Sequence, residues 1–497
     1  MSKQTNKLKL SCVQCGREYP WSFAPQCADC NGALVDVDYN LENARIGTDG
    51  PPMVRYFDFL PIASRDSIID GGEGNTPCFH AKELGKALGL NNLYIKNETA
   101  NPTRTTKDRQ GSMAVATFRE LGVTNFCTSS TGNSCTALAR IVSRYPDMQM
   151  NIFVGDEFLR RLNWVGAPNV KVFWLKNGTF VDAQNAAKWY ADQNGFTSER
   201  GFFFFGKREA LKVAYMEAVE QIPKPIDHYF QGASSAMGIY STYKASLQLQ
   251  QIGRIKNLPK LVGVQEETCN PMVRSWEKGL EKMDPADVIA RPRGLSKATL
   301  RGSPINVYHY VAAGIRHSGG TIVVAEQDAM REMRALVKET EGLDICYTSS
   351  MTVVAARKLR QSGWLDPDAV IMLNITGADR KGEAYPAPDF VVEKDGDGWV
   401  MEPYNPASDQ GILERVLRIL VDTSKMPAGT ELDTETRLVK GGLALDSVAL
   451  LEFTLALEQE FSIEIAETEL VKENFETMGA VAELIRRKIN KAAVGGR

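Results

Sequence analysis

The chain has 497 residues, of which 43% are hydrophobic and 24% are charged, and such a chain typically folds into two to four domains. Its net charge of -3 gives no overall attraction to nucleic acid. No run of ~18 apolar residues predicts a transmembrane helix. The opening "MSKQTNKLKLSC" also lacks the apolar core of a signal peptide. We therefore expect a cytoplasmic protein that binds neither membranes nor nucleic acid.

Four cysteines stand close together near the N-terminus, as "CVQC" and "CADC". Each pair can place two thiolates on one tight turn, and two such pairs are a common ligand set for tetrahedral zinc. The alternative is reduced or redox-active thiols, although a redox motif needs only one pair. We predict a zinc ribbon over residues 1–40, closed to water and therefore structural, with the ligands Cys12, Cys15, Cys27 and Cys30.

From about residue 80 to residue 385, short β-rich segments alternate with segments of helical periodicity. The predicted strands are "NLYIK", "NFCTSS", "MNIFVG", "VKVFWL", "KLVGVQ", "GTIVVA" and "AVIMLNITG". This alternation predicts the α/β class, with parallel sheets covered by helices on both faces. Because the region is long for one open sheet, we expect two α/β lobes with a cleft between them, over residues 41–385. The proline-bearing segment 386–408, with its "DGDG" turn, is expected to be a linker.

Four polar loops follow predicted strands or begin predicted helices: "NPTRTTKDR", "SSTGNS", "QGASSAMG" and "NITGADRKG". In an open α/β sheet such loops converge on the ligand crevice. The small residues Gly232–Ala236 would let an anion approach backbone N–H groups. Lys107 stands at a helix start, where the helix dipole disfavours a cation, although a surface or ion-paired lysine is the alternative. Together these features indicate a Schiff-base cofactor with a phosphate tail.

These segments, in this order, resemble the fold-type II pyridoxal-phosphate enzymes, and among them the threonine synthase and cysteate synthase family. The resemblance rests on "CADCNGALVDVDY", "EGNTP", "NPTRTTKDR", "SSTGNS", "GVQEETCNPM" and "NITGADRKG", and it extends from the ribbon to about residue 382. Five ordered matches after the ribbon make coincidence an unlikely source of the pattern. The resemblance implies pyridoxal 5'-phosphate as the cofactor and an amino acid as the substrate.

The resemblance also implies a role for each matching residue. Lys107 would hold the cofactor as a Schiff base and would move protons once the substrate displaces it. Asn133 would donate to the pyridoxal 3'-oxygen, and Thr376 would face the pyridine nitrogen. The substrate carboxylate would lie on Ser130, Thr131 and Gly132, and the cofactor phosphate on Gly232, Ala233, Ser234, Ser235 and Ala236.

The chain departs from the family pattern around the lysine, where Arg104-Thr105-Thr106 replaces the usual Gly-Ser-Phe. The phosphate loop and the "TGADRKG" segment differ as well, so we expect a substrate side unlike that of a threonine-forming enzyme. Arg104 would either bind an acidic substrate group or lie in solvent. Asp108 and Arg109 would either pair with each other or contact the substrate. Cys135 is expected to pack in the core rather than to act as a nucleophile.

Residues 409–497 are predicted to be mostly helical. "GGLALDSVALLEFTLALEQEFSIEI" has apolar residues at helical spacing, and Asp446-Ser447 stands where an N-cap would. The segment resembles an acyl or peptidyl carrier protein along its full length. That resemblance implies a four-helix bundle with 4'-phosphopantetheine on Ser447 and an acidic face that docks on basic partners.

The sequence therefore predicts a threonine synthase-like enzyme fused to its carrier. It would catalyse β- or γ-elimination or replacement on an amino acid within a carrier-dependent pathway, as in natural-product biosynthesis. We expect acyl or aminoacyl cargo on the carrier, a phosphopantetheinyl transferase and pathway synthetases as partners, and a homodimer. One alternative is carrier-independent, cysteate or cysteine synthase-like replacement on an O-activated serine. The other is a degenerate lobe that only scaffolds the carrier.

Overall fold

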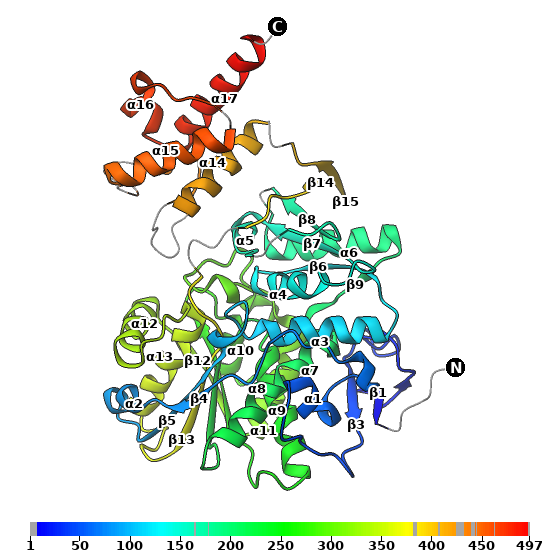
Figure 1. Ribbon diagram of the computed structural model, residues 1–497. Helices are drawn as coiled ribbons and strands as arrows, with labels where there is room; N and C mark the ends of the chain where they lie inside the picture. Colours follow the sequence, from blue (N-terminus) through cyan, green and yellow to red (C-terminus); the bar gives the residue numbers. More distant parts are fainter. Residues whose placement is uncertain are drawn as a thin grey trace.

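Two six-stranded sheets form the centre of the molecule in the computed structural model (Figure 1). The structure describes residues 7–163, 166–176, 178–380, 385–405, 408–423, 432–438, 443, 445–461 and 463–495. Each sheet belongs to its own lobe, and the predicted two-lobed α/β architecture is therefore confirmed.

The sheet of the larger lobe has the strand order β12-β11-β10-β13-β5-β4, and all its pairs are parallel except β4 with β5. Its central strands are nearly continuous apolar runs, as expected for strands buried on both faces. All six residues of β13, for example, are buried. The strands are β4 (Cys78–His80), β5 (Asn92–Asn97), β10 (His228–Gly232), β11 (Lys260–Glu266), β12 (Thr321–Ala325) and β13 (Val370–Ile375).

The sheet of the smaller lobe has the order β15-β14-β8-β7-β6-β9. Its strands are β6 (Asn125–Ser129), β7 (Gln149–Gly155), β8 (Val170–Leu175), β9 (Thr197–Ser198), β14 (Phe390–Asp395) and β15 (Gly398–Pro403). The last two form a hairpin whose first strand pairs in parallel with β8. The predicted linker over residues 386–408 therefore contains this hairpin, which is part of the sheet of the smaller lobe. The apolar residues of "FVVEKDGDGWV" flank a turn and complete the sheet edge.

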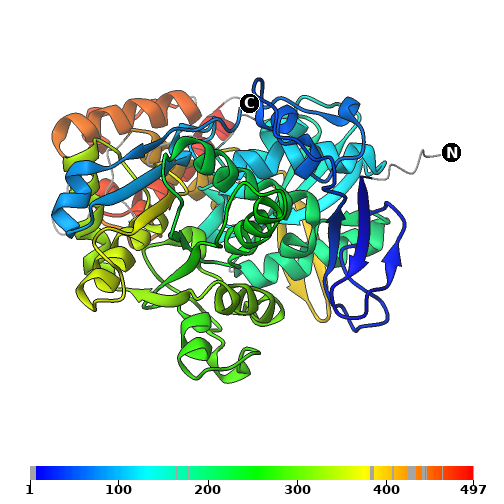
Figure 2. The same cartoon turned by 90° about the horizontal axis from the view of Figure 1, so that it is seen from below.

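Helices cover both faces of these sheets, and the view from below shows them around the larger lobe (Figure 2). One buried apolar cluster lies between the two lobes, and a separate cluster fills the outer side of each sheet. The helices of the two lobes are α1 (Pro52–Arg55), α2 (Lys82–Leu88), α3 (Lys107–Glu120), α4 (Asn133–Val142), α5 (Asp156–Leu159), α6 (Phe180–Asn194), α7 (Phe205–Ala210), α8 (Lys212–Gln221), α9 (Met237–Gln251), α10 (Pro271–Glu277), α11 (Ile305–His317), α12 (Gln327–Glu341) and α13 (Tyr347–Gln361).

The N-terminal ribbon is a three-stranded antiparallel sheet of β1 (Leu8–Cys12), β2 (Glu18–Tyr19) and β3 (Val35–Tyr39). It is joined to the lobes by a buried ion pair, because Arg208 Nη2 in α7 donates to Asp36 Oδ1 in β3 at 2.6 Å. Lys244 Nζ of α9 also donates to Asp36, at 2.8 Å. The Asp36 carboxylate therefore links the ribbon to two helices of the enzyme.

The C-terminal region is helical, as predicted, and it lies beside the smaller lobe in Figure 1. Its helices are α14 (Asp409–Thr423), α15 (Ser447–Phe461), α16 (Lys472–Phe475) and α17 (Met478–Gly495), which enclose an apolar core of their own. Asp446 caps α15, because its Oδ1 accepts from the backbone N–H of Ala449 at 2.8 Å.

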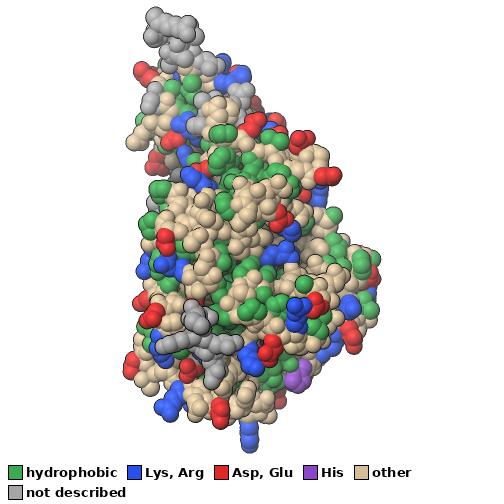
Figure 3. Space-filling view, turned by 90° about the vertical axis from the view of Figure 1, so that its right-hand side faces the viewer, with side chains coloured by type: hydrophobic (Ala, Val, Ile, Leu, Met, Phe, Trp, Pro, Cys, Tyr) green, Lys and Arg blue, Asp and Glu red, His purple; other side chains and the backbone are tan. Residues whose placement is uncertain are grey.

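The predicted apolar residues of α15 divide between two faces of the helix. Phe453, Leu457 and Phe461 are buried in the carrier core, whereas Val448, Leu451 and Leu455 are each more than half exposed. Among the described residues, no helix is both long enough and apolar enough to span a membrane. On the face drawn in Figure 3, charged side chains of both signs are interspersed, as the small net charge leads one to expect.

Candidate active site

Lys107 is the first residue of α3, and the loop before it is fixed to the loop after β13. The backbone N–H of Thr106 donates to the carbonyl of Thr376 at 2.9 Å, and that of Ala378 donates to the carbonyl of Arg104 at 3.0 Å. Arg104 itself adopts a left-handed backbone conformation, with φ of 58°. These bonds place Lys107 next to Thr376, although the two residues are far apart in the sequence.

One pocket brings together most of the predicted cofactor residues. Its wall includes Lys107, Asn133 and Thr376. Gly232, Ser234, Ser235 and Ala236 line it as well, whereas Ala233 does not. Ala233 is buried, and its N–H donates to the carbonyl of Val264 in the sheet. The pocket therefore combines a lysine, an amide, a hydroxyl and the small-residue loop.

Burial and, to a smaller extent, the nearby Lys207 cation lower the pKa of the Lys107 amine to about 8, while Glu199 acts in the opposite direction. Lys207 and Glu199 form a buried ion pair of their own, at 2.8 Å. A substantial fraction of Lys107 is thus neutral near pH 8 and can act as a nucleophile or a base.

The loop Gly232–Ala236 leads from β10 into the 15-residue helix α9. Within the described part of the chain, the backbone N–H groups of residues 234–238 donate to no protein acceptor. A Cβ atom on Gly232 would lie only 2.7 Å from the carbonyl oxygen of Thr348, so this position requires glycine. Free N–H groups at a helix start, in a pocket that also holds a lysine, fit the phosphate of pyridoxal phosphate.

Asn133 begins α4, and the predicted carboxylate loop precedes it. Ser130 Oγ accepts from the N–H of Gly132 at 3.1 Å, and Thr131 Oγ1 donates to the carbonyl of Ala298 at 3.3 Å. Residues 130–132 thus adjoin the pocket through Asn133 without lining it. Arg161 and Arg380 both donate to Oδ1 of Asn133, so its amide nitrogen is the group left to act as a donor.

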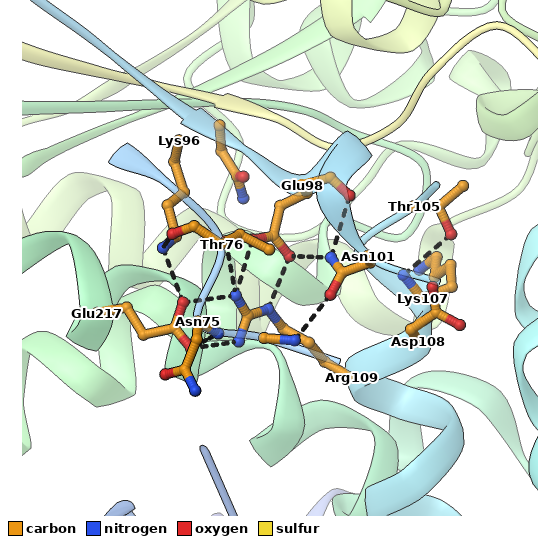
Figure 4. A network of polar contacts seen from close by, with 12 residues as sticks. Asn75, Thr76, Lys96, Glu98, Asn101, Thr105, Lys107, Asp108, Arg109 and Glu217 are labelled. Carbon is orange, nitrogen blue, oxygen red and sulfur yellow. Dashed lines mark hydrogen bonds and ion pairs between the residues drawn. The ribbon is translucent and has the colours of Figure 1, made fainter. Parts of the chain in front are cut away.

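Arg109 and Asp108 do not form the contacts expected from the sequence. Arg109 is buried between Glu98 and Glu217, to which it donates at 2.7–2.9 Å (Figure 4). Asp108 Oδ2 instead accepts from the N–H and the hydroxyl of Thr103, at 2.7 and 2.9 Å. The two side chains therefore neither pair with each other nor line the pocket, because each bonds to other residues instead.

Several residues of the pocket wall were not predicted. Three of them belong to the quoted segment "QGASSAMG" without having been assigned to the site, and the other four come from segments without a recognisable motif: Gln231, Met237 and Gly238, and Ala298, Thr299, Cys346 and Thr348. Gln231 and Met237 directly flank the predicted phosphate loop and could have been included for that reason. Cys135 is buried, and burial raises the pKa of its thiol to about 12, as expected for a core residue.

The four ribbon cysteines form a second cluster. The Sγ atoms of Cys12, Cys15, Cys27 and Cys30 all lie within 4.8 Å of one another. A tetrahedral zinc ion with Zn–S bonds of about 2.3 Å requires sulfurs about 3.8 Å apart. Cys15 and Cys27 lie 3.9 Å apart, so the arrangement is compatible with such an ion.

Comparison with known proteins identifies the class. Residues 69–377 match the family described as pyridoxal-phosphate dependent enzyme; this is more than half of the chain, which therefore belongs to that family. The threonine synthase of Methanocaldococcus jannaschii is 27% identical over 418 residues, which covers 82% of this chain and 99% of the relative. The cysteate synthase of Methanosarcina mazei is 26% identical over 393 residues, or 76% of this chain and 92% of that protein.

Two further comparisons complete the assignment. Residues 414–485 match the phosphopantetheine attachment site family. The structure of maize serine racemase has the same fold, with a TM-score of 0.52 at 14% identity, covering 62% of this chain and 89% of that one. The protein is thus a pyridoxal-phosphate-dependent enzyme related to threonine and cysteate synthases, and it is fused to a phosphopantetheine carrier domain.

Proposed function

We propose that this enzyme catalyses β- or γ-elimination or replacement on an amino acid and that its fused carrier takes part in the reaction. The observation that carries the proposal is the single pocket that holds Lys107, Asn133, Thr376 and the loop before α9. Pyridoxal phosphate, when bound, supplies the electron sink that makes the substrate α-proton acidic. The chain itself must then hold the cofactor, orient the substrate and move that proton.

The proposed residue roles are those that the resemblance to the family implies, and the positions of the residues in the pocket support them. The free N–H groups at the start of α9 bind the phosphate, and the Asn133 amide donates to the 3'-oxygen. Thr376 offers a neutral hydroxyl to the pyridine nitrogen, which weakens the electron sink relative to a carboxylate partner. Lys107 Nζ attaches the cofactor and accepts the α-proton, a role that its lowered pKa favours.

The substrate carboxylate is assigned to the loop of Ser130, Thr131 and Gly132, which adjoins Asn133. Here the loop's small side chains and its position before α4 support the proposal. We further propose a structural zinc ion on the four ribbon cysteines and phosphopantetheine on Ser447. The carrier would present an acyl or aminoacyl group loaded by synthetases of the same pathway.

Lys107→Ala tests the enzyme proposal. The variant should lose covalent cofactor, its visible absorbance band and turnover of O-activated serines and homoserines, while the thermal unfolding transition remains. Lys171→Ala is a matched control, because Lys171 in β8 pairs with Asp389 and lies outside the pocket wall. Turnover by the Lys107 variant within tenfold of the unmodified enzyme would reject the assignment.

A further inference from the structure

The carrier domain contacts the enzyme through a shielded carboxylate. Tyr385 Oη donates to Glu414 Oε1 at 2.9 Å, and Arg160 Nη2 lies 3.6 Å from Glu414 Oε2. Glu414 belongs to α14 of the carrier, whereas Arg160 follows α5 of the smaller lobe. Tyr385 and Glu414 are only 4% and 8% exposed. Because water competes little at such a site, the contact has more effect than a surface ion pair.

Arg161, the residue after Arg160, bonds to the loop of the candidate active site. Arg161 Nε donates to the carbonyl of Thr131 at 2.8 Å, and its Nη2 donates to Asn133 Oδ1 at 3.4 Å. A Cβ atom on Gly132 would lie 2.4 Å from Cβ of Arg161, so the two segments are in direct contact. Arg160 therefore contacts the carrier, and its neighbour Arg161 contacts the loop of the candidate active site.

The segment that joins the two contacts is well packed. Phe158, Leu159 and Leu162 are all buried, and the N–H groups of Arg161 and Leu162 bond back to Phe158 and Leu159. A displacement of Arg160 must therefore move Arg161 as well.

Arg161 also depends on its surroundings for its position. Its guanidinium donates to the carbonyl of Thr131 and to Asn133 Oδ1, both neutral oxygens, and burial together with the Arg380 cation lowers its pKa to about 10. No described carboxylate bonds directly to this guanidinium, so the packing of its own segment is what holds it.

From these contacts we infer that the carrier docks on its own enzyme through Glu414, and that docking positions Arg161 on the loop of Thr131 and Asn133. Glu414, Arg160 and Tyr385 are the docking residues, and Arg161 is a positioning residue. The consequence for catalysis rests on the proposed function, because it requires Asn133 to contact the cofactor. The docking contact itself does not depend on that function.

Hydrogen–deuterium exchange of the full chain tests the inference. In Glu414→Gln, amides of residues 158–163 and 131–136 should exchange about tenfold faster, because the ion pair with Arg160 is lost. Glu460→Gln is the matched control, since Glu460 pairs with Arg415 and Arg418 inside the carrier. It should leave both segments unchanged. Equal exchange in the Glu414 and Glu460 variants would overturn the inference.

A charge swap separates docking from a folding defect. Glu414→Arg should release the carrier and shift the visible absorbance of the bound cofactor, whereas Glu414→Arg with Arg160→Glu should restore both the spectrum and slow exchange. Modification of each variant by a phosphopantetheinyl transferase checks that the carrier is folded. If the double variant is modified by the transferase but recovers neither the spectrum nor slow exchange, docking through Glu414 is contradicted. If the unmodified enzyme held no cofactor on Lys107, the proposed function would fail while the exchange result still stood.

Discussion

Arg109 Nη2 lies 2.7 Å from Glu217 Oε2, and this fully buried ion pair joins α3 to α8 two residues beyond Lys107. Glu98 bonds to the same guanidinium at 2.7 Å, from the segment that follows β5. The start of α3 is thereby fixed to the larger lobe by charges that water cannot reach.

Removal of one partner from this network should be costly. Arg109→Met leaves the buried Glu98 without its bonded cation and leaves Glu217 with Lys96 alone, so the free energy of unfolding should fall by about 3–5 kcal/mol. Urea denaturation measures the change. Arg119, also in α3, forms an exposed pair with Asp147, and Arg119→Met should cost below about 1 kcal/mol. Similar losses in the two variants would contradict the structural role of Arg109.

The same network predicts a sensitivity to acid. Burial alone would raise the pKa of Glu98, but Arg109 outweighs it and holds the pKa at about 2, below the ordinary 4.5. The stability from this carboxylate is therefore present above pH 4.5 and lost as the pH falls toward 2. Urea midpoints measured across that range should fall in the unmodified protein and change less in Glu98→Gln. A parallel decline in both proteins would count against Glu98.

The rate of cofactor attachment should depend on the fraction of the Lys107 amine that is neutral. Only the neutral amine is nucleophilic, and burial with the Lys207 cation lowers its pKa to about 8. The rate of reconstitution from cofactor-free protein should rise with pH and level off above about 8. Stopped-flow absorbance provides the measurement. A rate that still rises in proportion to hydroxide up to pH 10 would indicate an ordinary lysine.

Substitution of Gly232 should weaken cofactor binding. The added methyl group of Gly232→Ala meets the carbonyl oxygen of Thr348 at 2.7 Å, so the loop before α9 must shift. We expect at least a tenfold loss of cofactor affinity by equilibrium titration. Gly166→Ala meets nothing within 4 Å and should bind normally. Normal binding by both variants would place the phosphate elsewhere.

The cysteine cluster should bind one zinc ion. Protein purified without chelator should contain about one equivalent by metal analysis, and Cys27→Ser should lose it and unfold its ribbon at lower temperature. Because all four ligands are sulfur, the loss should affect stability more than the chemistry in the pocket. Cys127→Ser lies outside the cluster and should keep its metal. Zinc-free protein with full ribbon stability would exclude the site.

Ser447→Ala tests whether the carrier takes part in the reaction. Only residues 404–408 separate β15 from α14, so the carrier stays near the enzyme and its cargo is held at high effective concentration. With the same free amino acid, the loaded protein and the variant should give different rates or products by mass spectrometry. Identical turnover and products would make the carrier a passenger in this reaction.

Much of the site could be predicted from sequence because its loops share one topological position. Lys107, Asn133 and Gly232 each follow or adjoin a recognisable strand, and parallel strands bring such loops to one edge. Cys346 and Thr348 escaped prediction because they begin α13 without any motif. The Arg109–Glu217 pair was equally hidden, since its partners are 108 residues apart and a charge gives no indication of its distant partner.

The fold was also predictable where the spacing of apolar residues and the length of a segment were clear, as in β13. The hairpin of β14 and β15 was missed because its "DGDG" turn and flanking prolines look like a linker when read locally. Only pairing with β8, more than two hundred residues earlier, makes that segment part of a sheet. Likewise, only the burial of its side chains shows that the apolar residues of α15 divide between a buried face and an exposed face.

The attachment of the ribbon through Asp36 has a practical consequence for anyone who shortens this protein. A chain that starts at residue 41 would lack the carboxylate that Arg208 and Lys244 share. The cations of Arg208 and Lys244 would then share, among the described carboxylates that pair with them, only Glu209, which also pairs with Lys212. A truncation intended to remove a dispensable metal module would thus damage the enzyme interior, and poor yield from such a chain would say nothing about whether zinc matters.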